Sequence, residues 1–260
     1  IFLMKIMLCN DDGIHAEGIN VLHGLLVKKH EVFVIAPEEE KSGAGSSITT
    51  KRPLIPNKVK ENFIAINGTP VDCVHLGLHQ LCPFKPDLLL SGINLGANMA
   101  EDLLYSGTVG AAMEGREFSI PSIAISAAAF IQPSSQGKSQ PNYLTAARIA
   151  LDIVERLPEI RIDSQITLNV NVPNLNYEEI NKINLTYPGT WGKRNPPHKE
   201  TSNSGEDQFW ITHRNKIPEN EENSDIATLS RGEVSISPIG PRFLVNDYDQ
   251  SLTKWINSFN

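Results

Sequence analysis

Residues 86–118, PDLLLSGINLGANMAEDLLYSGTVGAAMEGREF, decide the fold of this chain. The segment opens with an apolar run, Leu88-Leu89-Leu90, which is bounded by proline and glycine and is typical of a strand buried on both faces. Small and polar residues follow, so we expect a loop from Ser91 onward. A second small cluster, Ser106-Gly107-Thr108, precedes residues 109–117, whose composition predicts a helix. The N–H groups and hydroxyls of such a helix start suit a phosphate.

Strands and helices alternate on both sides of this segment. We expect strands at residues 4–9, 31–36, 63–66, 122–126, 166–172, 183–186 and 233–237, an antiparallel excursion at 48–54, and helices at 17–29, 71–80 and 142–157. The short apolar strands separated by helical patterns predict an α/β fold with a parallel sheet.

The texture of the chain changes at Tyr187. Residues 188–224 are rich in proline, glycine, asparagine and charge, and Phe209-Trp210-Ile211 is their one strand-like island. We therefore divide the chain into a core, residues 4–186, and an extension, residues 187–260. The extension contains hairpins that cover the site or reach another subunit, and a final strand and helix that return to the core.

Composition excludes several classes of protein. The formal net charge is −7 and the pI about 5.5, which argues against a surface for duplex nucleic acid. The three cysteines lack C-x-x-C spacing, so we expect neither disulfides nor structural zinc, as in a reducing cytoplasm. No apolar run approaches the roughly 20 residues of a membrane span.

Oxygen donors follow several of the predicted strands. Because the carboxyl ends of parallel strands meet at one edge of a sheet, these side chains should converge there. Oxygen ligands indicate Mg²⁺, Mn²⁺ or Ca²⁺. Two carboxylates, one hydroxyl and one amide balance the charge of a divalent ion and leave positions open for water and a phosphate oxygen, as at a catalytic metal. The donors are Asp11, Asp12, Ser42 and Asn94, with Asn98 and Ser106 to Thr108 as phosphate binders.

Four motifs occur in the order and spacing of a known family. They are NDDGIHAEGI, APEEEKSGAGSSIT, INGTPVDCV and SGINLGANMAEDLLYSGTVGAAMEG, and with them the chain closely resembles the survival protein SurE family. The resemblance is dense from Met4 to about Ser126 and thin through LNVNVP and EVSISPI. It implies a Rossmann-like three-layer α/β/α sandwich with a mostly parallel sheet and a C-terminal hairpin that is exchanged between subunits.

The resemblance also implies an activity and a set of site residues. Family members are metal-dependent 5′-nucleotidases of the cytoplasm, with some activity on 3′-nucleotides and short polyphosphates. One Mg²⁺ or Mn²⁺ per subunit would lie on the four ligands named above, and the phosphate on Asn98, Ser106, Gly107 and Thr108. Ala100 stands where the family usually has glycine, which bears on how closely the backbone approaches the site.

Three hypotheses remain at this point. The first is hydrolysis of nucleoside 5′-monophosphates at one divalent ion, with Asp11 and Asp12 as catalytic residues in a homodimer or homotetramer. The second is a nucleotide or metal sensor that uses the same residues without catalysis. The third is a phosphotransferase that forms an aspartyl-phosphate. Turnover separates the first from the second, and the chemical path separates it from the third.

Overall fold

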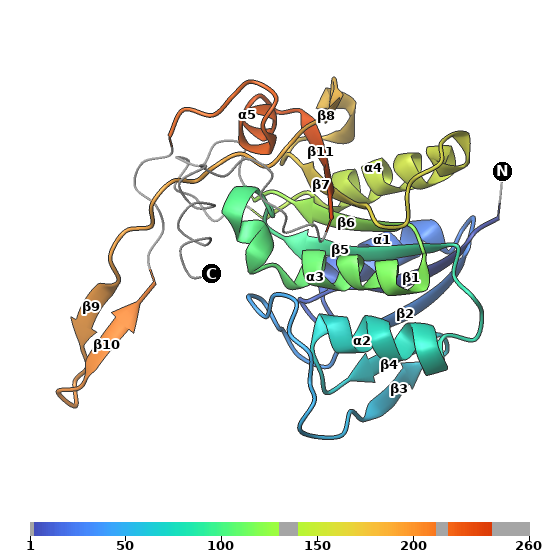
Figure 1. Cartoon of the computed structure of the whole chain (residues 1–260), viewed down its shortest axis with the longest axis horizontal. Helices are drawn as coiled ribbons and strands as arrows, with labels where there is room; N and C mark the ends of the chain where they lie inside the picture. Colours follow the sequence, from blue (N-terminus) through green and yellow to red (C-terminus); the bar gives the residue numbers. More distant parts are fainter. Residues whose placement is uncertain (1–2, 130–139, 212–217, 241–260) are drawn as a thin grey trace, which may run out of the picture.

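The computed structural model describes residues 3–129, 140–211 and 218–240 (Figure 1). One nine-stranded sheet runs through it in the order β3-β4-β2-β1-β5-β6-β7-β11-β8. The strands from β4 to β7 are parallel to one another, whereas β3 and β11 run antiparallel to their core neighbours. The strands are β1 (Lys5–Cys9), β2 (Glu31–Pro37), β3 (Pro56–Lys60), β4 (Phe63–Ile66), β5 (Leu88–Leu95), β6 (Ser122–Ala127), β7 (Thr167–Val172), β8 (Ile183–Leu185) and β11 (Val234–Ile239).

Helices cover both faces of the sheet, which gives the expected α/β/α sandwich. The first layer, α1 and α4, packs the apolar side chains Ile19, Leu22 and Ile149 onto one face. The second, α2 and α3, lies against the other face with Val74 and Ala111. The helices are α1 (Glu17–Leu26), α2 (Pro70–Leu76), α3 (Gly107–Glu114), α4 (Tyr143–Arg156) and α5 (Asp225–Ser230).

The central segment differs from expectation in one respect. Strand β5 does not end before Ser91 but continues to Leu95. Its pairing with β6 shifts register between Ser91 and Asn94, and then resumes. Gly92, at φ 140°, fits there because a Cβ would lie 2.3 Å from the carbonyl oxygen of Ile125. The small polar residues that suggested a loop therefore accommodate an irregular strand end.

Other boundaries differ by less. Helix α3 begins at Gly107, two residues before the predicted start. The antiparallel excursion expected at residues 48–54 is wrong in position, because the strand that pairs with β4 is β3, at Pro56–Lys60. Helix α2 begins at Pro70, one residue before the predicted start, with Thr69 and Asp72 forming a capping box, and it ends at Leu76, where a π-helical turn, Gly77–Leu81, completes the predicted span.

The extension forms the expected hairpin. Strands β9 (His198–Thr201) and β10 (Asp207–Trp210) pair in a separate two-stranded sheet that projects away from the sandwich (Figure 1). The chain then returns through α5 to β11, which joins the main sheet. Residues 241–260, where a helix returning to the core is expected, lie outside the described residues.

Candidate functional site

The predicted donors follow three neighbouring strands. Strands β2, β1 and β5 are adjacent and parallel, so the loops that leave their carboxyl ends meet at one edge of the sheet. Asp11 and Asp12 follow β1, and Ser42 follows β2. Asn94 is the next-to-last residue of β5. This edge is where open α/β sheets bind ligands.

Asp11 lies in a tight turn under the start of α3. Asn10 closes the turn by donating from Nδ2 to the carbonyl oxygen of Gly13, at 2.9 Å. Asp11 is only 3% exposed, and its Oδ1 accepts a short hydrogen bond from the Thr108 hydroxyl. A Cβ on Gly107 would lie 2.9 Å from Oδ2, so only glycine lets α3 approach this closely.

Asp12 faces the end of β5. Its Oδ2 accepts a hydrogen bond from the backbone N–H of Leu95 at 3.2 Å, which brings it next to Asn94. Burial raises the pKa of Asp12 to about 7, and the neighbouring Asp11 carboxylate adds to the rise. Burial likewise raises the pKa of Asp11, although the Thr108 hydroxyl opposes this shift. The buried Asp11 carboxylate and the half-buried Asp12 carboxylate therefore repel each other when both are charged.

Ser42 reaches this edge through the backbone of its loop. The N–H of Lys41 donates to the carbonyl oxygen of Asp11 at 2.7 Å, which fastens the loop to the β1 turn. The hydroxyl of Ser42 donates to Glu40 Oε1 at 2.9 Å and is exposed. Glu40 belongs to the run Glu38-Glu39-Glu40, and its charge raises the pKa of both Asp11 and Asp12. A run of three glutamates gave no signal that one of them approaches the site.

Asn94 is 9% exposed. Its Nδ2 donates to the carbonyl oxygen of Gly96 at 2.9 Å. This hydrogen bond orients the side-chain amide, so the oxygen is the atom available to a cation.

Asn98 is tied to the neighbouring strands. Its Nδ2 donates to the Ser126 hydroxyl at 2.9 Å, and its backbone N–H donates to Asn171 Oδ1 at 2.8 Å. The side chain is buried, and its position is set by β6 and β7. The structure thus fixes Asn98 close to the end of β5, in the same region as Asn94.

The start of α3 carries the remaining predicted residues. Ser106 is the N-cap, and its hydroxyl accepts from the N–H of Val109 at 3.1 Å. Thr108 is fully buried and bonded to Asp11. Both hydroxyls are therefore engaged within the protein, and the backbone N–H groups of the first turn are what this helix offers to an anion.

Comparison with known proteins gives the family. The model of the family described as "Survival protein SurE" matches residues 6–195. The chain belongs to the SurE family. It is 41% identical over 253 residues to the 5′-nucleotidase SurE of Pseudomonas putida (strain W619), covering 97% of this chain and 98% of that protein. The 5′-nucleotidase SurE of Pseudomonas savastanoi pv. phaseolicola is 41% identical with the same coverage.

A solved structure of a SurE protein has the same fold. The crystal structure of the SurE protein from Aquifex aeolicus superposes with a TM-score of 0.80 at 37% identity, covering 98% of this chain and 99% of that chain. The SurE fold therefore extends through the C-terminal part of the chain, where the sequence motifs are thin.

Ala100, at the position where the sequence resemblance leads us to expect glycine, has a backbone conformation that glycine adopts readily. Its φ is 49°, in the left-handed region that L residues rarely adopt. Its N–H donates to Asp225 Oδ2 at 2.9 Å. The departure from the family pattern therefore leaves a left-handed residue at this position, held by a buried carboxylate.

The donor set fits the divalent ion that SurE resemblance implies. Within the described residues, neither Asp11 nor Asp12 forms an ion pair with a lysine or arginine. Their mutual repulsion thus calls for a cation. No group of three or more His, Cys, Asp or Glu residues suited to a metal occurs in the described part of the chain, as expected where serine and asparagine complete the set.

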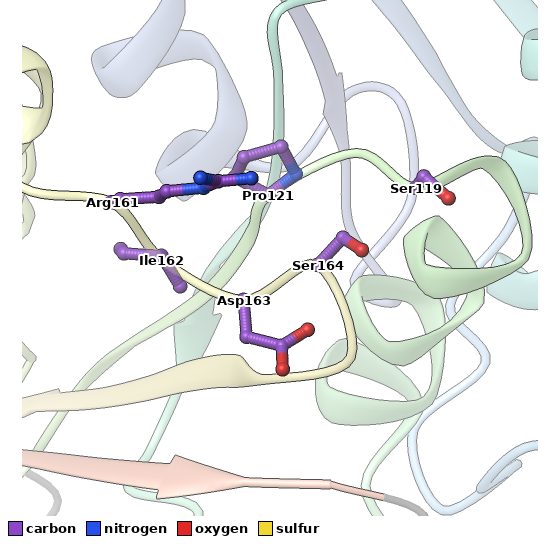
Figure 2. Close-up of a pocket in the computed structure, with 6 residues that line it drawn as sticks. All are labelled: Ser119, Pro121, Arg161, Ile162, Asp163 and Ser164. Carbon is purple, nitrogen blue, oxygen red and sulfur yellow. The ribbon is translucent and has the colours of Figure 1, made fainter.

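A cavity at the opposite edge of the sheet is an alternative site. It has a volume of about 570 Å³ and lies near the starts of β6 and β7, at the opposite edge of the sheet from Asp11 (Figure 2). Its charged lining consists of Arg161 and Asp163, and Asp163 already accepts from the N–H of Gln165 at 2.9 Å. It offers no paired carboxylates, so the chemistry favours the edge with Asp11. Over residues 3–129, 140–211 and 218–240, no helix is long and apolar enough to cross a membrane.

Proposed function

We propose that this SurE-family chain hydrolyses nucleoside 5′-monophosphates to nucleoside and phosphate, with one Mg²⁺ or Mn²⁺ per subunit. The chain is a phosphoric monoester hydrolase of the 5′-nucleotidase type, given its identity of about 41% to curated 5′-nucleotidases over nearly its whole length. The observation that carries the metal dependence is the pair of unneutralised carboxylates at the carboxyl edge of the sheet, the buried Asp11 and the half-buried Asp12. 3′-Nucleotides and short polyphosphates are further substrates of this proposal.

Asp11, Asp12, Ser42 and Asn94 would hold the ion. When bound, it supplies a positive charge that polarises the phosphoryl group and lowers the pKa of a water molecule. Ser42 donates to Glu40 in the structure, so its hydroxyl would turn away from Glu40 when it ligates.

The chain's own residues bind the substrate phosphate and orient the water. Asn98 and the first turn of α3, at Ser106, Gly107 and Thr108, provide hydrogen-bond donors for the phosphate oxygens. One carboxylate of the Asp11–Asp12 pair orients the attacking water. Its oxygen bonds to phosphorus as the ester P–O bond breaks, and the nucleoside leaves with its oxygen protonated.

The geometry favours water over an aspartate as the nucleophile. Asp11 Oδ1 accepts from Thr108, and Oδ2 lies against Gly107. With the remaining oxygens of Asp11 and Asp12 directed to the ion, neither carboxylate would have a well-aligned oxygen for attack on phosphorus, as an aspartyl-phosphate would require. The phosphotransferase hypothesis is therefore the weaker one.

Phosphate release tests the function. Nucleoside 5′- and 3′-monophosphates, short polyphosphate and simple phosphate esters are incubated with demetallated protein, to which each divalent ion is returned in turn. We expect release from 5′-monophosphates only with Mg²⁺ or Mn²⁺. Binding of nucleotide and metal without phosphate release would support the sensor instead.

We also propose a cytoplasmic homodimer or homotetramer, with residues 4–186 as the catalytic core and residues 187–260 as the oligomerising extension. The free cysteines Cys9, Cys73 and Cys82 support a reducing compartment.

A further inference from the structure

The segment that follows β5, residues 98–102, is fixed from its inner side by two asparagines of β7. Asn169 and Asn171 each donate from Nδ2 to the carbonyl oxygen of Asn98, at 2.9 Å. Asn171 Oδ1 also accepts the N–H of Asn98. These are the asparagines of the LNVNVP motif, and both are fully buried. The backbone of Asn98 thus forms three hydrogen bonds with side chains of β7, two accepted by its carbonyl oxygen and one donated by its N–H.

The outer side is fixed by Asp225, at the first position of α5. Its Oδ2 accepts the N–H of Ala100 at 2.9 Å, and its Oδ1 accepts those of Gly189 and Ile226, each at 2.8 Å. The three donors belong to three segments: the stretch after β5, the start of the extension, and α5. The carboxylate is fully buried, and its bonds hold Ala100 in the left-handed conformation.

A second contact comes from the same part of the extension. The indole Nε1–H of Trp191 donates to the carbonyl oxygen of Met99 at 3.1 Å, and the backbone N–H of Trp191 donates to Glu101 Oε2 at 2.8 Å. The Thr190 hydroxyl donates to Glu101 Oε1 at 2.6 Å. Residues 189–191 therefore lie along residues 99–101.

The two chain segments at the base of the hairpin pair with each other near this contact. Tyr187 and Ser224 form a β-bridge, and the Tyr187 hydroxyl donates to Glu221 Oε2 at 2.6 Å. The segment that leads to β9 and the segment that returns from β10 are thus joined next to the hydrogen bond between Asp225 and Ala100. The position of residues 98–102 and the base of the hairpin depend on the same carboxylate.

We propose that Asp225 is a positioning residue, which holds residues 98–102 in the conformation that binds the substrate phosphate and links them to the base of the hairpin extension. This inference rests on the proposed function, because it assumes that Asn98 contacts the phosphate. Asp225 touches neither substrate nor metal. It acts through the backbone of Ala100, two residues from Asn98.

The test uses the full chain carrying Asp225→Asn, which keeps the size of the side chain but replaces one acceptor oxygen by a donor. We expect the Kd of inorganic phosphate, measured by calorimetry with saturating Mn²⁺, to rise about tenfold, and KM to rise more than kcat falls. The Kd of Mn²⁺ should stay unchanged. Hydrogen exchange of the amides of residues 98–102 should accelerate at least tenfold. Glu221→Gln is the matched control, since it loosens the hairpin base without touching these residues and should leave all five values unchanged.

A gentler variant covers the case in which Asp225→Asn does not fold. Trp191→Phe keeps an aromatic side chain but removes the indole N–H that donates to Met99, together with part of the ring volume, and should raise the phosphate Kd two- to fivefold. A folded Asp225→Asn, or failing that a folded Trp191→Phe, with unchanged phosphate affinity overturns the inference.

The outcomes also separate this inference from the proposed function. If the wild-type chain binds phosphate with Mn²⁺ but hydrolyses no ester, the proposed function fails, and the effect of Asp225→Asn on phosphate affinity still decides the inference. If the wild-type chain binds no phosphate, the role of residues 98–102 is refuted with it.

Discussion

At the scale of single residues, the site concentrates negative charge where burial makes charge costly. Asp11 and Asp12 are sequence neighbours, both have raised pKa values, and the Glu40 carboxylate adds to the repulsion. A folded protein retains such an arrangement where a bound cation offsets it, and several kcal/mol of transition-state stabilisation can come from that cation.

Removing one carboxylate should therefore abolish most activity without unfolding the chain. We expect Asp11→Asn or Asp12→Asn to lower kcat by roughly a thousandfold, which corresponds to several kcal/mol. Chelation should have the same effect on the wild-type enzyme, and Mn²⁺ should restore it. Steady-state kinetics and circular dichroism are the measurements, with Asp152→Asn on α4 as the control. Full activity after thorough demetallation would refute the metal dependence.

Asp12 also predicts how the metal-free protein responds to pH. A folded-state pKa of about 7, against an ordinary value of 3.8, means that the folded state keeps a proton that the unfolded state has lost. The contribution of Asp12 to stability is complete below about pH 4 and is lost as the pH rises through 7.

Unfolding curves from pH 5 to pH 8 measure this. The free energy of unfolding of the metal-free wild type, relative to Asp12→Asn, should fall by on the order of 2–3 kcal/mol across this range. Mn²⁺ added at pH 8 should recover stability in the wild type. Parallel pH profiles of the two proteins would show that Asp12 does not titrate there.

The chemical path gives another prediction for the same residues. If Asp11 and Asp12 both ligate the ion, and Asp11 Oδ1 also accepts from Thr108, neither has a free, well-aligned oxygen for attack, so we expect water to be the nucleophile in one displacement at phosphorus. A substrate whose phosphorus is made chiral with oxygen isotopes should give phosphate of inverted configuration. Retention would indicate two displacements and a phosphorylated aspartate.

At the scale of elements, the start of α3 packs closely against the turn after β1 because Gly107, the first residue of α3, has no side chain. A methyl group on Gly107 would lie 2.8 Å from the Asp11 Cβ. We expect Gly107→Ala to displace Asp11 and to cost about a hundredfold in kcat/KM, since a displacement of about 1 Å has that effect.

Gly24→Ala on α1 is the matched control for Gly107→Ala. No heavy atom would lie within 4 Å of its new Cβ, and it is helical, so it should keep full activity and gain about 0.5–1 kcal/mol of stability. Equal activity of the two variants would show that Gly107 is not constrained by Asp11.

Local signals in the sequence predicted the elements well, and long-range contacts explain what they missed. Helix α3 could be predicted from Ser106 because an N-cap acts within three residues. The irregular end of β5 could not, since it depends on pairing with β6. Asp225 bonds Ala100 across 125 residues of sequence, and in the sequence it is one acid in a polar extension. Such partners are set by the sheet order, which no local pattern specifies.

At the scale of the whole molecule, the sandwich positions the candidate site at one edge of its sheet, whereas the β9–β10 hairpin lies outside the sandwich. The four residues of β9 and the four of β10 are all exposed. A two-stranded hairpin is at best marginally stable in water. Nevertheless it carries Phe209, Trp210 and Ile211 at exposures of 64%, 58% and 79%. Apolar side chains gathered in this way mark an interaction site.

We expect a second copy of the chain to cover this hairpin. Light scattering on the full chain at micromolar concentration should give at least the mass of a dimer. Phe209→Ser combined with Trp210→Ser should raise the dissociation constant by tenfold or more, because buried aromatic anchors contribute about 2 kcal/mol or more each. The control, Val27→Ser, changes an exposed apolar residue at the end of α1 and should leave the mass unchanged. A wild-type monomer under these conditions would mean that the hairpin serves its own chain, as a cover over the site at Asp11 and Asp12.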